Sequence, residues 1–157
     1  MDSILLRPLR YGDRGPVLEV FAGLSERSRR LRFLGSKPRL LASDLEQLVD
    51  VGRWGREAVA AVDQETGRTV GIARFVRDEG ALEAEIAFAV VDEWQGRGLG
   101  KQLLAELRVL ARDQGILRFR AEIAHGNAPA FALVRGLGDE LMRSYEDGNV
   151  KLVVRLP

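Results

Sequence analysis

Residues 85–101 constrain this chain more than any other stretch, because a predicted strand is followed there by three alternating glycines and a long amphipathic segment. The run reads Glu-Ile-Ala-Phe-Ala-Val-Val-Asp-Glu-Trp-Gln-Gly-Arg-Gly-Leu-Gly-Lys. Glycine lets a backbone approach an anion closely, and the N-terminus of a helix carries a partial positive charge. The stretch therefore predicts a strand, a turn and a helix entry that bind a phosphate group.

The composition excludes several other kinds of site. The chain has no cysteine, so it offers no thiol nucleophile, disulfide or thiolate metal site. His125 is the only histidine, which excludes a multi-histidine metal centre within one chain, and we expect no metal. The net charge of +1 gives no overall field that would favour nucleic acid or a membrane surface. No apolar run approaches the roughly 20 residues of a membrane span.

The first residues, Met-Asp-Ser-Ile-Leu-Leu-Arg-Pro, do not resemble a secretory signal. They lack a basic segment, an apolar core and a small-residue cleavage site. A cytoplasmic location is therefore the default expectation.

The N-terminal third is expected to hold one short strand and three helices. Asp13 and Ser25 are candidate caps for the first two helices, and Ser43 with Glu46 has the capping-box spacing for the third. The four arginines of the second helix are expected to form a solvated face, with contact to an acidic protein partner or to a phosphate group as the alternatives. These elements are a strand over 3–7 and helices over 14–24, 26–33 and 43–51.

The remainder alternates strands with two helices. Short turns separate the first three strands, which indicates an antiparallel meander. The expected strands are 56–63, 68–77, 82–91, 117–123, 139–145 and 149–155, and the expected helices are 98–113 and 127–134. The order predicts a single α+β domain over residues 1–157, with a mixed, mostly antiparallel sheet of about seven strands flanked by helices.

Two familiar glycine motifs fail on spacing. A dinucleotide-binding turn needs G-x-G-x-x-G, whereas Gly96, Gly98 and Gly100 follow G-x-G-x-G. A nucleoside triphosphate loop needs G-x-x-x-x-G-K-S/T, but Gln95 and Gln102 occupy two of its essential positions. A third pattern, Q-x-x-G-x-G, does match.

In this context Q-x-x-G-x-G resembles the acyl-CoA pyrophosphate loop of the GNAT superfamily of N-acetyltransferases. The resemblance covers nearly the whole chain, and Asn127 resembles the asparagine of that family's second CoA-binding segment. It implies a sheet splayed between its fourth and fifth strands, with acetyl-CoA as the acyl donor. It also implies a set of CoA-binding residues: Val90, Val91, Gln95, Gly96, Arg97, Gly98, Leu99, Gly100, Lys101 and Asn127.

Acyl transfer to an amine needs a group that removes a proton, because a lysine amine with a pKa near 10.4 is protonated at neutral pH. On a period of two, Glu83 and Glu85 share one strand face with Ala87 and Ala89, whose small side chains leave room for pantetheine. Glu85 lies in a sequence that resembles the strand carrying the general-base glutamate of lysine-acetylating members. We expect Glu85 to be the base, with Glu83 as the alternative.

Residues 24–34, Leu-Ser-Glu-Arg-Ser-Arg-Arg-Leu-Arg-Phe-Leu, resemble the start of the acetyltransferase domain in bacterial protein-lysine acetyltransferases. This implies a protein lysine as acceptor. A small-molecule amine and a non-catalytic CoA-binding regulatory role remain alternatives. Many family members place a tyrosine after the asparagine as general acid, but residues 128–137 contain none, and no acid is assigned.

Overall fold

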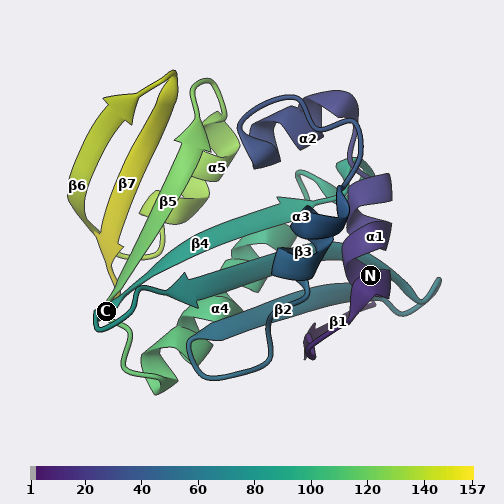
Figure 1. Cartoon of the computed structure of the whole chain (residues 1–157), viewed down its shortest axis with the longest axis horizontal. Helices are drawn as coiled ribbons and strands as arrows, with labels where there is room; N and C mark the ends of the chain where they lie inside the picture. The colour runs from purple at the N-terminus through teal and green to yellow at the C-terminus, as the bar shows by residue number, and fades with distance from the viewer. Residues whose placement is uncertain (1–2) are drawn as a thin grey trace.

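The computed structural model describes residues 3–157, so Met1 and Asp2, the start of the N-terminal segment considered above, lie outside the described residues. Seven strands form one sheet in the order β1-β2-β3-β4-β5-β7-β6 (Figure 1). The strands are β1 (Ile4–Pro8), β2 (Arg56–Asp63), β3 (Arg68–Arg77), β4 (Glu83–Val90), β5 (Arg118–Ala124), β6 (Asp139–Glu146) and β7 (Asn149–Arg155).

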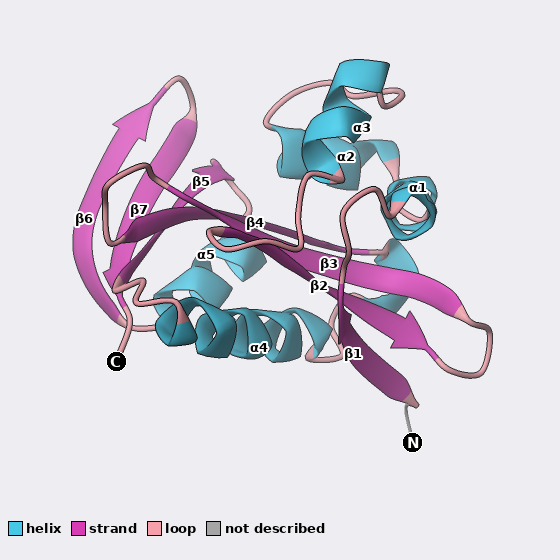
Figure 2. Cartoon of the chain, turned by 60° about the horizontal axis from the view of Figure 1, so that its bottom comes forward, coloured by secondary structure: helices cyan, strands magenta, loops and turns pink. Residues whose placement is uncertain are grey.

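Helices cover both faces of the sheet. Figure 2 shows α4 and α5 on one face and α1, α2 and α3 on the other. The helices are α1 (Arg14–Ala22), α2 (Glu26–Phe33), α3 (Ala42–Leu48), α4 (Leu99–Asp113) and α5 (Ala128–Arg135), with a 3-10 turn at Asp92–Trp94. The predicted α+β class is confirmed.

The sheet opens between β4 and β5. All other strand pairs are antiparallel, whereas β4 and β5 run parallel. They pair only over Glu83–Glu85 and 118–120, after which they diverge (Figure 1). Helix α2 contacts both strands and so spans the opening. The predicted splay between the fourth and fifth strands is confirmed.

Helix α4 packs against the sheet next to the opening and forms part of the main core. Its apolar side chains recur at the helical period and are buried against β2, β3 and β4. On β4 the alternate residues Ala84 and Ile86 are buried in the same core, which leaves Glu85 and Ala87 on the opposite face. The buried residues of α4 are Leu99, Leu103, Leu104, Leu107 and Ala111.

Two of the three predicted helix caps are wrong. Asp13 makes no cap to α1, because its carboxylate accepts a hydrogen bond from the Arg10 amide instead. Helix α3 begins one residue earlier than predicted, and Asp44 rather than Glu46 accepts a hydrogen bond from the backbone amide at the N-cap, Leu41. The Leu41 side chain has no acceptor, so no capping box forms. The Ser25 cap is confirmed, since its hydroxyl accepts a hydrogen bond from the Ser28 amide at 3.1 Å.

Within residues 3–157, every helix is too short or too polar to cross a membrane.

Candidate active site

The loop between β4 and α4 has a backbone suited to an anion. Gly96 and Gly98 have φ values of +77° and +82°, a conformation that other residues adopt only with strain. Nothing lies within 4 Å of the place where either Cβ would be, so the space beside the loop is open. No side chain caps α4, and its first turn holds no acidic residue. The first amides of α4 are therefore free for a phosphate.

Gly100 and Leu99 act by packing. A Cβ on Gly100 would lie 2.9 Å from Leu133 Cδ1, so glycine allows α4 to pack closely against α5. Leu99 is buried in the core, which leaves only its backbone to meet a ligand. These two predicted residues therefore fix the position of the loop and of the first turn of α4.

Arg97 and Lys101 are both exposed at the start of α4. The Arg97 guanidinium lies 4.6 Å from the centre of the Trp94 ring. In the described part of the chain, neither cation has a carboxylate within 4.0 Å. Both are free to balance the charge of phosphate groups.

Gln95 links the loop to α2. Its Nε2 donates hydrogen bonds to the Val90 carbonyl at 3.0 Å and to the Ser28 hydroxyl at 3.3 Å. Its side chain is therefore already engaged within the protein. The glutamine of the Q-x-x-G-x-G pattern serves here to fix the loop as well as to border the anion site.

A second link joins the same two regions. The Asp92 amide donates to the Gly23 carbonyl, and the Asp92 carboxylate accepts from the Ser25 amide, both at 3.0 Å. Partial desolvation raises the pKa of Asp92, but hydrogen bonds from Ser25 and Ser28 outweigh it and lower the pKa below its ordinary value. Asp92 is thus an ionised carboxylate that links the α1–α2 turn to the loop between β4 and α4.

The backbone of Val91 is not available for pantetheine. Its amide donates to the Val70 carbonyl, and its carbonyl accepts from the Trp94 amide, both at 2.9 Å. Because the direction of backbone hydrogen bonds alternates along an antiparallel strand, the Val90 and Phe88 groups point the other way, toward the opening. The geometry therefore supports the Val90 amide, although the Val90 carbonyl already accepts from Gln95. It does not support Val91, and the strand register adds Phe88 as a further candidate.

Asn127 lies at the start of α5, beside the end of β5. Its Oδ1 accepts a hydrogen bond from the Ala130 amide at 3.4 Å and so caps the helix. Its Nδ2 makes no hydrogen bond to residues 3–157, which leaves both N–H donors of this group free for a ligand.

The two glutamates of β4 have different surroundings. Glu83 accepts hydrogen bonds from Arg118 at 3.2 Å and Arg120 at 2.7 Å, and only 20% of its side chain is exposed. Glu85 is 57% exposed and has one distant ion-pair partner, Arg120, at 3.7 Å. Hydrogen bonds to Asp78 and Glu83 outweigh desolvation and raise the pKa of Arg120 further above its usual value. Of the two carboxylates, Glu85 is the one free to accept a proton.

Glu85 borders a cavity of about 490 Å³. Ala87 faces the same cavity, and together with Ala89 it also faces an adjoining apolar pocket below α1 and α2. The small residues of β4 thus make room on the α1–α3 side of the sheet. Residues of α2, α3, β2, β3 and β4 line the cavity: Arg32, Phe33, Asp44, Gln47, Leu48, Arg56, Arg74, Val76, Glu85, Ile86 and Ala87.

Two arginines of this cavity were not predicted as site residues. Arg32 was expected on a solvated helix face, but it is partly buried and lines the cavity. Arg74 comes from the middle of β3, where the sequence pattern gives no sign that its side chain meets α2. Tertiary packing brings both beside Glu85.

No cluster of three or more acidic or histidine side chains that could hold a metal ion occurs among residues 3–157.

The sequence matches the acetyltransferase (GNAT) family over residues 28–139. It is 32% identical to Acetyltransferase PA5475 of Pseudomonas aeruginosa over 148 residues, which cover 92% of this chain and 78% of the relative. It is also 32% identical to Acetyltransferase Pat of Mycolicibacterium smegmatis over 134 residues, 85% of this chain but only 40% of the longer relative.

The GNAT domain of S. lividans PAT superposes with a TM-score of 0.85 at 31% identity, covering 96% of this chain and 89% of that domain. The two chains therefore share one fold. The chain therefore belongs to the GNAT family of acetyltransferases, whose acyl donor is acetyl-CoA.

Proposed function

We propose that this acetyltransferase transfers the acetyl group of acetyl-CoA directly to a primary amine, with Glu85 as general base. One observation carries the proposal. Glu85 is a loosely paired carboxylate at the last β4–β5 pair before the sheet opens, and it faces the cavity lined by α2 and α3. An amine that entered through the cavity would reach Glu85 and the opening together.

The residues of this chain divide the work. Acetyl-CoA supplies the activated acyl group. The first amides of α4, with Arg97 and Lys101, bind the pyrophosphate, and the Val90 and Phe88 backbone orients pantetheine in the opening. Glu85 removes a proton from the ammonium form of the acceptor, directly or through a water, because only the neutral amine is a nucleophile.

The acceptor has two candidates. A protein lysine is supported by the resemblance of residues 24–34 to protein-lysine acetyltransferases and by the overall similarity to the Pat protein of M. smegmatis. A small-molecule amine is favoured by a different observation, the cavity with unpaired arginines beside Glu85. Mass spectrometry of candidate proteins and free amines after incubation with acetyl-CoA distinguishes the two.

The variant Glu85→Gln tests the base. We expect turnover at neutral pH to fall by about 100-fold, because a positioned base typically contributes a factor of that order. Calorimetry should give an acetyl-CoA affinity close to that of the unaltered protein, since the glutamate does not border the pyrophosphate loop.

Two further variants sharpen this test. Glu93→Gln changes an exposed glutamate of the 3-10 turn and should leave turnover unchanged. If Glu83→Gln, rather than Glu85→Gln, causes the large fall in turnover at neutral pH, Glu83 is the base. Acetyl-CoA binding without transfer to any amine would instead favour a regulatory CoA-binding domain.

A further inference from the structure

We infer that the cavity beside Glu85 binds an anionic group of the acceptor, and that the acceptor is a small acidic amine. Such a molecule carries a carboxylate, phosphonate or phosphinate a few bonds from its primary amine. The inference rests on the proposed function, which places the amine at Glu85, and it chooses between the two acceptor candidates.

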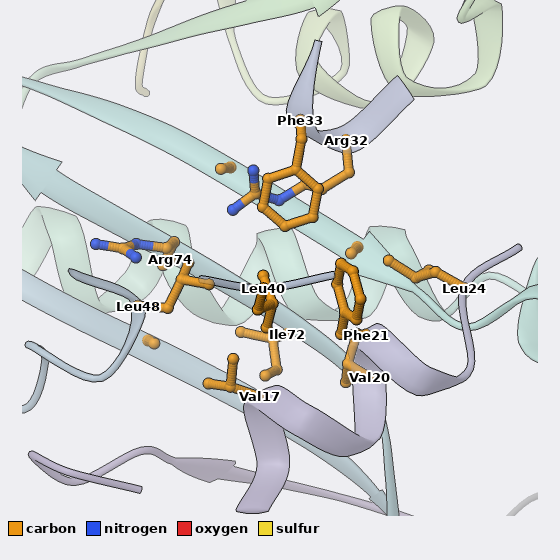
Figure 3. A pocket seen from close by; sticks show the side chains of 13 residues that line it. Val17, Val20, Phe21, Leu24, Arg32, Phe33, Leu40, Leu48, Ile72 and Arg74 are labelled. Atoms are coloured by element: carbon orange, nitrogen blue, oxygen red, sulfur yellow. The ribbon is translucent and has the colours of Figure 1, made fainter. Parts of the chain in front are cut away.

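Two guanidinium groups lie on one side of the space below α2. Figure 3 shows Arg32 and Arg74 with their nitrogens toward the Leu48 side, whereas Phe21 and Leu24 close the other side. Arg32 and Arg74 line both the apolar pocket and the larger cavity that contains Glu85. The cavity is therefore polarised, with its cations beside the proposed base.

These two arginines lack the partners that the other charged residues of the cavity have. Arg56 pairs with Asp50 at 3.2 Å, and Asp44 pairs with Lys37 at 3.1 Å. Throughout the described residues 3–157, neither Arg32 nor Arg74 has a carboxylate within 4.0 Å, and Arg74 donates only to the Gln47 carbonyl at 3.3 Å. The Arg32 guanidinium lies 4.6 Å from the centre of the Phe33 ring, but its N–H groups have no hydrogen-bond acceptor among residues 3–157. An anion would supply acceptors to both arginines.

Electrostatics agree with this reading. Desolvation and the charge of Arg74 lower the pKa of Arg32 to about 10. Desolvation and the charge of Arg56 likewise lower the pKa of Arg74, although Asp50 and Glu85 oppose this. Both side chains stay protonated at neutral pH and repel each other. An anion between them would relieve the repulsion and form charge-assisted hydrogen bonds.

The strand register sets the distance between the two ends of the acceptor. Glu85 pairs with Val76 and Arg74 with Ala87, so Glu85 and Arg74 are diagonal neighbours on one face of the sheet. The Cα atoms of such diagonal neighbours are about 7–8 Å apart. An amine at Glu85 and an anion at Arg74 are therefore joined by a short chain, as in an amino acid. A protein lysine carries no anion within its own side chain.

The size of the cavity fits such a molecule. Its volume of about 490 Å³ lies in the range of small-ligand sites, roughly 300–1,000 Å³.

The experiment compares matched amines that differ in charge. Glycine, β-alanine and 4-aminobutanoate are each assayed against the corresponding amide, and 2-aminoethylphosphonate distinguishes a phosphonate from a carboxylate. Thiol release from acetyl-CoA reports turnover, and rates are compared at equal concentration of the unprotonated amine. At least one acid should exceed its amide by about tenfold or more in kcat/KM, because hydrogen bonds between charged groups add that much.

Variants locate the anion site. Arg74→Gln and Arg32→Gln should each raise KM for the acid about tenfold and leave KM for the amide unchanged, whereas Arg74→Lys should retain part of the preference. Arg68→Gln alters an exposed arginine at the start of β3 and is the matched control. Circular dichroism establishes that each variant is folded. If Arg74→Gln does not fold, the single variants Arg32→Gln and Arg74→Lys still test the anion site.

Binding separates failure of this inference from failure of the proposed function. Calorimetry measures each amine against protein saturated with CoA, which needs no turnover. Equal rates and affinities for acids and amides, or a lysine peptide that exceeds every acid, would overturn the inference and leave acetyl transfer intact. Arginine-dependent binding of acids without thiol release would overturn the proposed acyl transfer and support the anion site. If no acid binds and no amine, lysine peptides included, causes thiol release, the anion site and the proposed acyl transfer are both wrong.

Discussion

The donor side and the acceptor side of this acetyltransferase are built in different ways, although both depend on β4. The proposed donor side consists mostly of backbone: the amides at the start of α4, positive φ values at Gly96 and Gly98, and strand groups that face the opening. The cations of Arg97 and Lys101 add to it. The proposed acceptor side consists of side chains from five separate helices and strands, among them Arg32, Arg74 and Glu85.

This difference teaches where specificity can reside. A backbone cradle recognises phosphates and an amide-bearing arm, and it needs little from side chains beyond glycine. A cavity lined by long charged side chains can change its preferred ligand by single substitutions. We expect changes on the donor side to affect acetyl-CoA alone, and changes on the acceptor side to affect the amine alone.

The largest expected effect breaks the donor side. Gly98→Val places a β-branched residue at φ +82°, which costs on the order of 1–3 kcal/mol and displaces the first amides of α4. KM for acetyl-CoA should rise by tenfold or more in steady-state kinetics, with KM for the amine unchanged.

Gly67→Val is the control for that change. Gly67 has a similar φ of +74° and equally open surroundings, but it lies in the β2–β3 turn. Both variants should lower the melting temperature by similar amounts, whereas only Gly98→Val should weaken acetyl-CoA. An equal loss of acetyl-CoA affinity in both would mean that the loop conformation has no specific role.

A second variant sharpens the acceptor side. Arg120→Met removes the cation nearest to Glu85 and also frees Glu83 and Asp78. Without Arg120 the Glu85 carboxylate loses its ion-pair partner on β5 and is less firmly positioned, so turnover at neutral pH should fall several-fold in steady-state kinetics.

The acetyl-CoA affinity of Arg120→Met should stay the same. The exposed Arg155, which pairs with Asp139 on the β6 side of the sheet, gives a matched control as Arg155→Met. Equal turnover of Arg120→Met and Arg155→Met would count against Glu85 as the base.

The smallest expected effect lies where the two sides meet. Asp92→Ala removes the carboxylate that accepts the Ser25 amide and so loosens the α1–α2 turn from the CoA loop. We expect the free energy of unfolding to fall by about 1 kcal/mol and both KM values to rise a few-fold. Chemical denaturation and steady-state kinetics measure these effects.

A pH series checks the cause of the Asp92 effect. The lowered pKa of Asp92 means that its contribution to stability is present above the pKa of the unfolded state, near 3.9, and is lost as the pH falls below it. The difference between the unaltered protein and Asp92→Ala should therefore shrink below about pH 4. A difference that stayed constant while the pH fell far below the unfolded-state pKa would assign the effect to packing.

The sequence alone determined the element order and the family, and it located the glycine loop of the proposed donor side. Periodicity placed nearly all helices and strands within two residues of their observed bounds, because α4 and the strands carry strong local patterns. The glycine spacing located the loop, since a positive φ is a local requirement of the backbone. The Asp13 and Glu46 caps were wrong because neighbouring polar groups, Arg10 and Asp44, compete for the same hydrogen bonds.

Only the tertiary structure decided the acceptor side. Arg32 and Arg74 are 42 positions apart, and nothing in either local pattern indicates that both face one cavity. Likewise, the ion pairs from Arg118 and Arg120 that engage Glu83 and leave Glu85 loosely held arise from the pairing of β4 with β5. Local patterns report the conformation of a segment, whereas the partners of a charged side chain depend on which distant segments pack against it.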